Sequence, residues 1–400
     1  MNFQTSKVIF WYILSSFGFF FGLSAIQFHS ILFESKHFVG MPFSLLMVTG
    51  SFAGILSPLV MAFALKYFKK SIHILWLLTA IAGLSLPLMP HLSSFPLLLG
   101  VYFLHTFSVW SIFPLQMSCG LDICRTQKPS LFFILRSFGT MGFLSGCLFS
   151  YFLVHSKNIE WLYNYFALGF LLSFLGLFFL NASTTQTDSQ LFAISSKNKF
   201  YSKKNMLRLL VFIKDPLFLR LLIAIFFLSW ANSMAIGVKG NYLINIFHLD
   251  ESQVSFAWIL CAGFEIPIMY FCIFLIKRYG LATVLIFSAL ATMVRLGLMA
   301  VTPSLPFFYA GLLLHGFYYA GVVTGIGMCI DRSYKRYRTL FQIIATLIYA
   351  GIPNSIGNFM TGIIWENFNL KTVYYASFGL AIVSLLLFYP LIPRLRKRFS

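Results

Sequence analysis

Four charged side chains lie inside long apolar stretches of the sequence, namely Arg136, Lys239, Glu265 and Arg295. A charge at the centre of a membrane-spanning helix costs about 2.5–3.5 kcal/mol on insertion scales. Such a side chain is retained where it faces a wet cavity, pairs with another charge or binds a solute. The four residues therefore predict a polar site within apolar helices. Ion pairs that only fix helix packing are the alternative.

Polar and aromatic residues accompany these charges at helical spacing, which places them on shared helix faces. Arg136, Thr140 and Phe143 follow one another at i, i+4 and i+7, so one face carries a cation, a hydroxyl and an aromatic ring. Comparable spacings relate three further groups: Trp258 with Ala262 and Glu265, Asn232 with Lys239, and His315 with Tyr319. Apart from Ala262, we expect the members of all four groups to bind substrate.

Glu265 is the only carboxylate that the apolar pattern places deep in a span. Its protonation could change with its exposure or with the arrival of substrate, which makes it the candidate proton-coupling residue. Arg295 and His315, on the next two spans, are expected to modulate it. The alternative is that Glu265 binds substrate hydroxyls and stays ionised.

Motifs of enzyme chemistry are absent from the sequence. It contains no G-x-x-x-x-G-K-[ST] phosphate loop, no H-E-x-x-H and no G-x-S-x-G. The six cysteines form no C-x-x-C pair and fall in or beside apolar runs, so we expect neither a metal site nor a disulfide framework. The sequence predicts neither an enzyme nor a cofactor, and any work must be driven by an ion or substrate gradient.

The elements that must position these residues are helices in a lipid bilayer. Of 400 residues, 59% are apolar and only 10% are charged, far below the charge content of a soluble domain. Apolar runs long enough to span hydrocarbon predict an all-α membrane protein with twelve helices. The expected spans are 8–33, 42–65, 73–89, 95–121, 131–154, 161–180, 217–247, 253–276, 281–301, 305–330, 339–364 and 371–393.

The basic residues are distributed unevenly about these spans. With a cytoplasmic N-terminus, 22 of the 29 Lys and Arg residues fall in cytoplasmic segments and three in outer loops. This positive-inside pattern predicts that both termini are cytoplasmic, and we expect a monomer in the inner cell membrane. The short loop near Ser252 is expected outside. The net charge of +19 is thus explained by topology and gives no reason to expect nucleic acid binding.

One long polar stretch divides the spans six and six. We expect residues 1–180 to form one six-helix half, 181–216 a cytoplasmic linker and 217–400 the second half as a pseudo-repeat of the first. Glycine pairs with G-x-x-x-G spacing, such as Gly18/Gly22 and Gly142/Gly146, are expected to serve close helix packing. Two linked six-helix halves are the layout of the major facilitator superfamily, in which substrate binds between the halves near mid-membrane.

Several short motifs indicate a particular family within this superfamily. The segments LRSFGTMGF (135–143), KRYG (277–280) and LLHGFYYAG (313–321), with Glu265 and Arg295, resemble the nucleoside:proton symporter family, in the lactose permease-like branch of that superfamily. The resemblance implies that Arg136, Thr140 and Phe143 line a nucleoside site and that Glu265 is its acidic residue. The chain departs from the family pattern where Met234, Gly237 and Ala262 replace amides and His315 replaces Tyr.

The sequence therefore predicts a secondary transporter that imports a nucleoside or similar small polar metabolite by proton symport with alternating access. Two alternatives stay open. Because cations outnumber the carboxylate within the spans, the same fold could carry an anionic organic solute or a sugar. The other alternative is a membrane sensor that does not transport.

Overall fold

A computed structural model describes residues 3–64, 71–125, 131–154, 159–183, 215–301, 304–333, 345 and 347–399. Every regular element within these ranges is a helix. The chain divides into two compact units, which are described in turn. The first unit takes residues 1–37, 52–198 and 251–256, and the second takes 38–51, 199–250 and 257–400. After α7 the chain passes from the first unit to the second at residue 198, between the sequence-based boundaries at 180 and 217, which stay a prediction.

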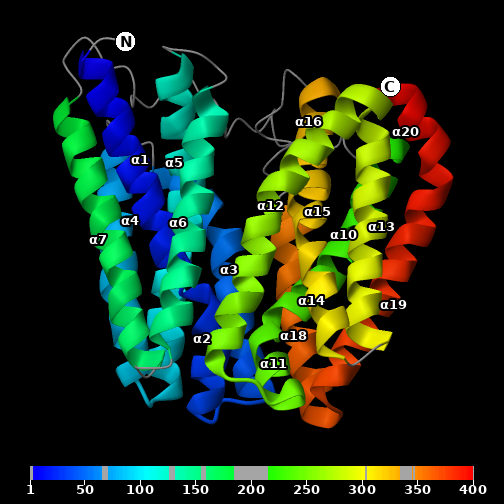
Figure 1. The fold of residues 1–400 in the computed structure, drawn as a ribbon, viewed down its shortest axis with the longest axis horizontal. Helices are drawn as coiled ribbons and strands as arrows, with labels where there is room; N and C mark the ends of the chain where they lie inside the picture. The colour runs from blue at the N-terminus through cyan, green and yellow to red at the C-terminus, as the bar shows by residue number, and fades with distance from the viewer. Residues whose placement is uncertain are drawn as a thin grey trace. The chain divides into compact units, whose positions relative to one another are not determined.

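The first unit is a bundle of long apolar helices. Its helix α1 packs against both α6 and α7, and α4 packs against α5 and α7; Figure 1 shows these helices running along one another. The helices are α1 (Phe3–Leu23), α2 (Ile26–Ser35), α4 (Ser71–Leu88), α5 (Phe95–Arg125), α6 (Leu131–Leu153) and α7 (Ile159–Ser183), with a short 3-10 turn η1 (Met89–His91). Helix α3 (Met41–Ala64) contributes its second part.

Small residues allow the helices of this unit to approach closely. A Cβ on Gly18 would lie 2.6 Å from the carbonyl oxygen of Gly169, and a Cβ on Gly142 would overlap the backbone of Phe17. Gly22 and Gly146 are similarly enclosed. The expectation that these glycine pairs serve helix packing is confirmed, because no larger side chain fits between α1 and its neighbours α6 and α7.

The second unit is also helical. Its helix α19 packs against α10 and α13, and α10 packs against α18, as Figure 1 shows. The α-helices are α10 (Pro216–Gly237), α11 (Lys239–Phe247), α12 (Glu251–Tyr279), α13 (Leu281–Val301), α14 (Leu305–Leu313), α15 (His315–Phe317), α16 (Thr324–Ser333), α18 (Ile352–Asn367), α19 (Leu370–Phe388) and α20 (Ile392–Phe399). The first six residues of α12 belong to the first unit. Two π-helical segments, η4 (Tyr318–Val323) and η6 (Leu347–Gly351), and a 3-10 turn η7 (Tyr389–Leu391) complete it.

Nine helices in the described ranges are long and apolar enough to cross a membrane, and two shorter apolar helices accompany them. The predicted eleventh span, 339–364, lies partly outside the described residues, and the count of twelve stays a prediction. Three expected spans are broken rather than continuous. The first divides between α1 and α2, the seventh at Val238, and the tenth at Leu314 before a π-helical segment.

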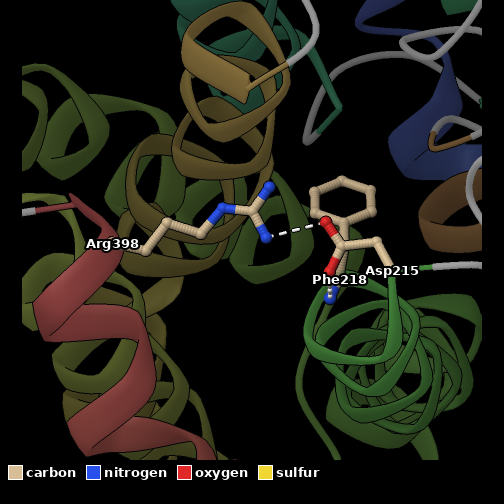
Figure 2. Close-up of polar contacts among 3 residues, drawn as sticks. All are labelled: Asp215, Phe218 and Arg398. Atoms are coloured by element: carbon tan, nitrogen blue, oxygen red, sulfur yellow. Dashed lines mark hydrogen bonds and ion pairs between the residues drawn. The ribbon is translucent and has the colours of Figure 1, made fainter.

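Helix α10 begins at a well-defined cap where the described chain resumes. Asp215 takes an extended conformation, its Oδ1 accepts a hydrogen bond of 3.2 Å from the Phe218 N–H, and Pro216 occupies the first turn. The other carboxylate oxygen pairs with Nη1 of Arg398 at 2.7 Å, as Figure 2 shows. Asp215 thus fixes the start of α10 and ties it to the last helix, α20.

The structure corrects one expectation about the outer loops. Ser252 is buried in the first turn of α12 rather than exposed in a loop, whereas Asp250, just before this helix, is exposed. Asp250 is therefore the better position for testing the predicted topology by chemical labelling.

We predict that a cysteine at Asp250 reacts with a membrane-impermeant maleimide in intact cells, while a cysteine at Ser195 reacts only after the membrane is opened. The reason is the charge asymmetry, which places the linker in the cytoplasm. The unsubstituted protein provides the background, since its described cysteines are all buried. Strong labelling of the Ser195 variant in intact cells would contradict the predicted topology and place the linker outside the cell.

Candidate functional site

Lys239 is buried at the break in the seventh span. Helix α10 ends at Gly237, Val238 leaves the helical conformation, and Lys239 starts α11 with only 3% of its surface exposed. Its Nζ lies 3.2 Å from the centroid of the Trp258 ring and donates to the Cys261 Sγ at 3.6 Å. A cation over an aromatic face is stabilised by the ring quadrupole. The contact joins α11 to α12 in the interior of the unit.

Arg295 and His315 form the second buried contact. Arg295, on α13, is 2% exposed, and its Nη1 lies 2.9 Å from the Nδ1 of His315. A guanidinium can only donate, so Nδ1 must accept and the imidazole proton sits on Nε2. The edge of His315 also meets Trp258, with ring centroids 6.3 Å apart. Side chains from α11, α12, α13 and α15 are therefore linked.

Glu265 joins this group through a close approach of backbones. It lies half-buried on α12, about two turns after Trp258. A Cβ on Gly316 would lie only 2.9 Å from the Cα of Glu265, so only glycine permits this contact beside His315. The Glu265 carboxylate is also near enough to the Tyr319 hydroxyl to interact with it electrostatically.

Tyr319 lies in a π-helical segment that presents it beside His315. The two rings lie 5.1 Å apart, as the four-residue spacing predicts, and Tyr319 is 39% exposed. The preceding Tyr318 is buried, and its hydroxyl lies 2.8 Å from Ser229 Oγ and 3.2 Å from the Tyr349 carbonyl oxygen. Tyr318 thus anchors the segment to α10 and η6, while Tyr319 lies beside His315. Such π-helical insertions often occur at functional sites.

We call these six residues the second-unit cluster: Lys239, Trp258, Glu265, Arg295, His315 and Tyr319. Both Lys239 and Arg295 lie near enough to His315 to act on it electrostatically. The cluster offers two cations, one carboxylate, an imidazole and two aromatic rings that carry polar groups. It can therefore hold a polar solute by charge, hydrogen bonding and ring contacts. Nowhere in the described ranges do three His, Cys, Asp or Glu side chains gather to hold a metal ion.

Several buried polar atoms in the second unit have no hydrogen-bond partner among the described residues, and two of them belong to residues discussed above as candidates. These two are the Nε of Arg295 and the Oδ1 of Asn232, on side chains 2% and 3% exposed. An unsatisfied buried polar group costs about 1–3 kcal/mol, and more when it is charged. Both atoms are thus suited to bind water or a solute. The helix break at Val238 separates Asn232 from Lys239, so their seven-residue spacing does not place them on one continuous face.

The candidates on the fifth predicted span belong to the first unit. Thr140 and Phe143 are both half-buried on α6, whereas the Arg136 side chain lies outside the described residues. Gly139 and Gly142, which alternate with them along the helix, contact Phe20 and Phe17 of α1. One face of α6 is therefore a packing face. Thr140 and Phe143 stay predicted binding residues.

Sequence reasoning missed three features of the second-unit cluster. It did not anticipate the break that orients Lys239, the position of Cys261 beside the ammonium, or the role of Gly316. The glycines in the stretch G-V-K-G (237–240) were a possible signal, because glycine inside a helical pattern often marks an interruption. The tight contact at Gly316 has no signal in a single sequence.

The close approach at Gly316 yields a prediction with a matched control on α12. We predict that Gly316→Ala forces α12 away from α15, destabilising the protein by about 1–3 kcal/mol and lowering its melting temperature by roughly 2–6 °C. Gly263→Ala should leave it unchanged or raise it, because a Cβ there meets nothing within 4 Å and alanine favours helix. Thermal unfolding of both purified variants tests this. Equal melting temperatures would show that α12 and α15 can separate freely.

Solved transporters share this arrangement of helices. The structure is similar to that of a mutant form of the nucleoside transporter NupG, with a TM-score of 0.82, 14% identity, and coverage of 96% of this chain and 99% of that one. It is also similar to the D-xylose-proton symporter, with a TM-score of 0.71, 12% identity, and coverage of 96% and 97%. At these identities the likeness establishes the fold alone. No curated protein matches the sequence.

A family model gives the broader assignment. The model described as the MFS_1-like family matches residues 10–376, which is most of the chain. This match agrees with the all-helical structure of the described residues, with the helices able to span a membrane and with the fold of the two transporters. The protein is therefore an integral membrane transporter of the major facilitator fold, and it belongs to the MFS_1-like family.

Proposed function

We propose that the protein imports a nucleoside or a similar small polar metabolite by proton symport with alternating access. The observation that carries the proposal is the second-unit cluster, in which a carboxylate, two cations and an imidazole gather inside apolar helices. Burying so many charges is costly, and ionisable residues within membrane spans commonly mark a solute or ion pathway. We further propose an inner-membrane location, cytoplasmic termini and a monomeric state.

The likeness to solved transporters supports the choice of substrate and coupling. One similar structure is named a nucleoside transporter and another a D-xylose-proton symporter. Together they favour a neutral polar metabolite and a proton as the coupled ion. The identities are low, so the cargo of this protein rests on its own residues and on direct measurement.

Several candidate residues take distinct roles in this proposal. Glu265 takes and releases the coupled proton, because it is the carboxylate of the cluster. His315 is held by Arg295 in a neutral form and serves the site as a positioned hydrogen-bond donor through Nε2. The face of Trp258 is covered by the Lys239 ammonium. Arg136, Thr140 and Phe143, in the first unit, stay proposed substrate-binding residues, as the family resemblance implies.

Uptake into proteoliposomes tests the function directly. The purified protein is given labelled nucleosides, nucleobases, sugars and carboxylates in turn, with and without an imposed proton gradient. Saturable nucleoside uptake that the gradient drives above equilibrium supports the proposal. Saturable uptake that does not depend on the proton gradient would contradict proton coupling. Saturable entry of none of the solutes favours a membrane sensor.

A second candidate cargo is an anionic organic solute, and a specific observation favours it. The cluster contains two cations against one carboxylate, and the Nε of buried Arg295 has no partner in the described part of the chain. A guanidinium presents a fork that matches a carboxylate or phosphate. An anion would satisfy the free edge of Arg295 and reduce the excess of positive charge.

The proton-coupling role predicts the behaviour of Glu265→Gln. Glutamine resembles protonated glutamate in shape and hydrogen bonding but cannot release a proton. We predict that uphill accumulation is abolished while exchange of substrate across the membrane survives. Expression, substrate binding, exchange and proton-driven uptake are measured on the same variant. Glu251→Gln, at the start of the same helix, is the control and should transport normally.

Other outcomes for Glu265→Gln assign other roles. Parallel loss of binding and exchange would make Glu265 a substrate ligand. Poor expression would indicate a structural ion pair, since removing one partner leaves a buried charge uncompensated. Arg295 donates to His315 rather than to a carboxylate in the described part of the chain, which leaves Lys239 as the partner to consider. Full proton-driven accumulation would contradict the coupling role.

The two cargo classes predict different results for Lys239→Met. Methionine keeps much of the length and apolar bulk of lysine but removes its charge. If the cargo is anionic, its affinity should fall at least roughly tenfold, since a hydrogen bond to a charged group contributes about 1.5–3 kcal/mol. If the cargo is a neutral nucleoside, its affinity should change little. Lys277→Met, at the exposed end of α12, is the matched control.

A further inference from the structure

A hollow of about 420 Å³ opens between the ends of α1 and α7, within the first unit. It lies where α1 begins and α7 ends. Its lining residues are Ser6, Lys7, Phe10, Trp11, Phe179 and Ser183. They combine one cation and two hydroxyls with three aromatic rings.

The packing of α1 against α7 explains why the hollow forms there. Deeper in the bundle, small residues bring the helices together, and a Cβ on Gly176 would lie 2.6 Å from the backbone nitrogen of Ser15. One turn nearer the end, the rings of Trp11 and Phe179 stack with centroids 4.7 Å apart and planes at 25°. Both rings also line the hollow. The space beyond them is left open and is bounded by the stacked pair.

The lining matches a ligand with two chemically distinct parts. Lys7 is exposed and, with Ser6 and Ser183, provides a cation and hydroxyl donors at the polar end. None of the described residues that line the hollow is acidic. Phe10 is 55% exposed and offers apolar surface next to these groups. An anionic head group joined to a hydrocarbon chain would satisfy both parts, and aromatic residues are common where such molecules meet a helix end.

We propose that this hollow binds an anionic glycerophospholipid of the surrounding membrane. The phosphate lies against Lys7 and the two serines, and an acyl chain runs along Phe10 and the stacked Trp11–Phe179 pair. A volume of about 420 Å³ suits the phosphoglycerol head and the first part of a chain. The predicted topology places the site in the cytoplasmic leaflet. The lipid would stabilise the α1–α7 pair at this end of the two helices.

Trp11 provides a direct reporter of this lipid. The full-length protein is reconstituted into vesicles that contain brominated phosphatidylglycerol or brominated phosphatidylcholine, and quenching of tryptophan fluorescence is measured against lipid fraction. Subtracting the signal of Trp11→Phe isolates Trp11, because phenylalanine preserves the stacked pair. We expect half-maximal quenching of Trp11 at a roughly fivefold lower fraction of the anionic lipid, as one lysine near an anionic surface implies.

Matched lysine variants distinguish a specific lipid-binding site from non-specific attraction of anionic lipid to basic side chains. Lys7→Gln should abolish the preference of Trp11 quenching for the anionic lipid, while Lys277→Gln, an exposed cation at the end of α12, should leave it intact. Both side chains are exposed, so folding should be preserved, and the melting temperature in detergent checks this. Equal quenching by the two lipids in the unmodified protein would overturn the proposal in favour of ordinary boundary lipid. Absence of quenching by either would overturn it by showing that the chain itself covers the hollow. None of these readouts depends on transport.

Discussion

The burial of Lys239 and Arg295 is the constraint around which the second unit is organised. Both side chains are almost fully buried, and a buried charge must find compensating groups. The Lys239 ammonium lies over the face of Trp258 and donates a hydrogen bond to the Cys261 thiol. The Arg295 guanidinium donates a hydrogen bond to the Nδ1 of His315. In each case the partners lie on a different helix from the cation. The two cations therefore link α11, α12, α13 and α15 into one group.

The irregular backbone of this unit is consistent with the same constraint. The break at Val238 separates Lys239 from the face of α10, and the interruption at Leu314 places His315 at the start of a short helix. The π-helical segment then separates the anchored Tyr318 from the more exposed Tyr319. Non-helical backbone at membrane depth is tolerated where it lies within protein or lines a cavity. In the first unit, small residues let α1 approach α6 and α7 closely.

Sequence reasoning could anticipate the helices and the charged residues but not the contacts between them. Hydropathy alone gives spans such as 281–301, which the structure matches as α13, because crossing hydrocarbon imposes length and composition. The unusual chemistry of Lys239, Glu265 and Arg295 is equally visible in the sequence. Which side chains meet could not be predicted, since helical spacing fails across a break such as that at Val238. The pairing of His315 with Arg295 also depends on tertiary packing between helices that spacing does not describe.

The charge of the second-unit cluster links the identity of the cargo to the mechanism of coupling. With His315 neutral, Lys239 and Arg295 leave one net positive charge when Glu265 is ionised and two when it is protonated. Protonation therefore strengthens the attraction of the cluster for an anion, and by linkage a bound anion favours protonation to the same extent. An anionic cargo would thus be coupled to the proton by charge alone. A neutral nucleoside gains nothing from that change in net charge. For such a cargo, coupling must come from the hydrogen bond that a protonated Glu265 can donate and an ionised one cannot, so its strength would depend on the geometry between substrate and carboxyl group.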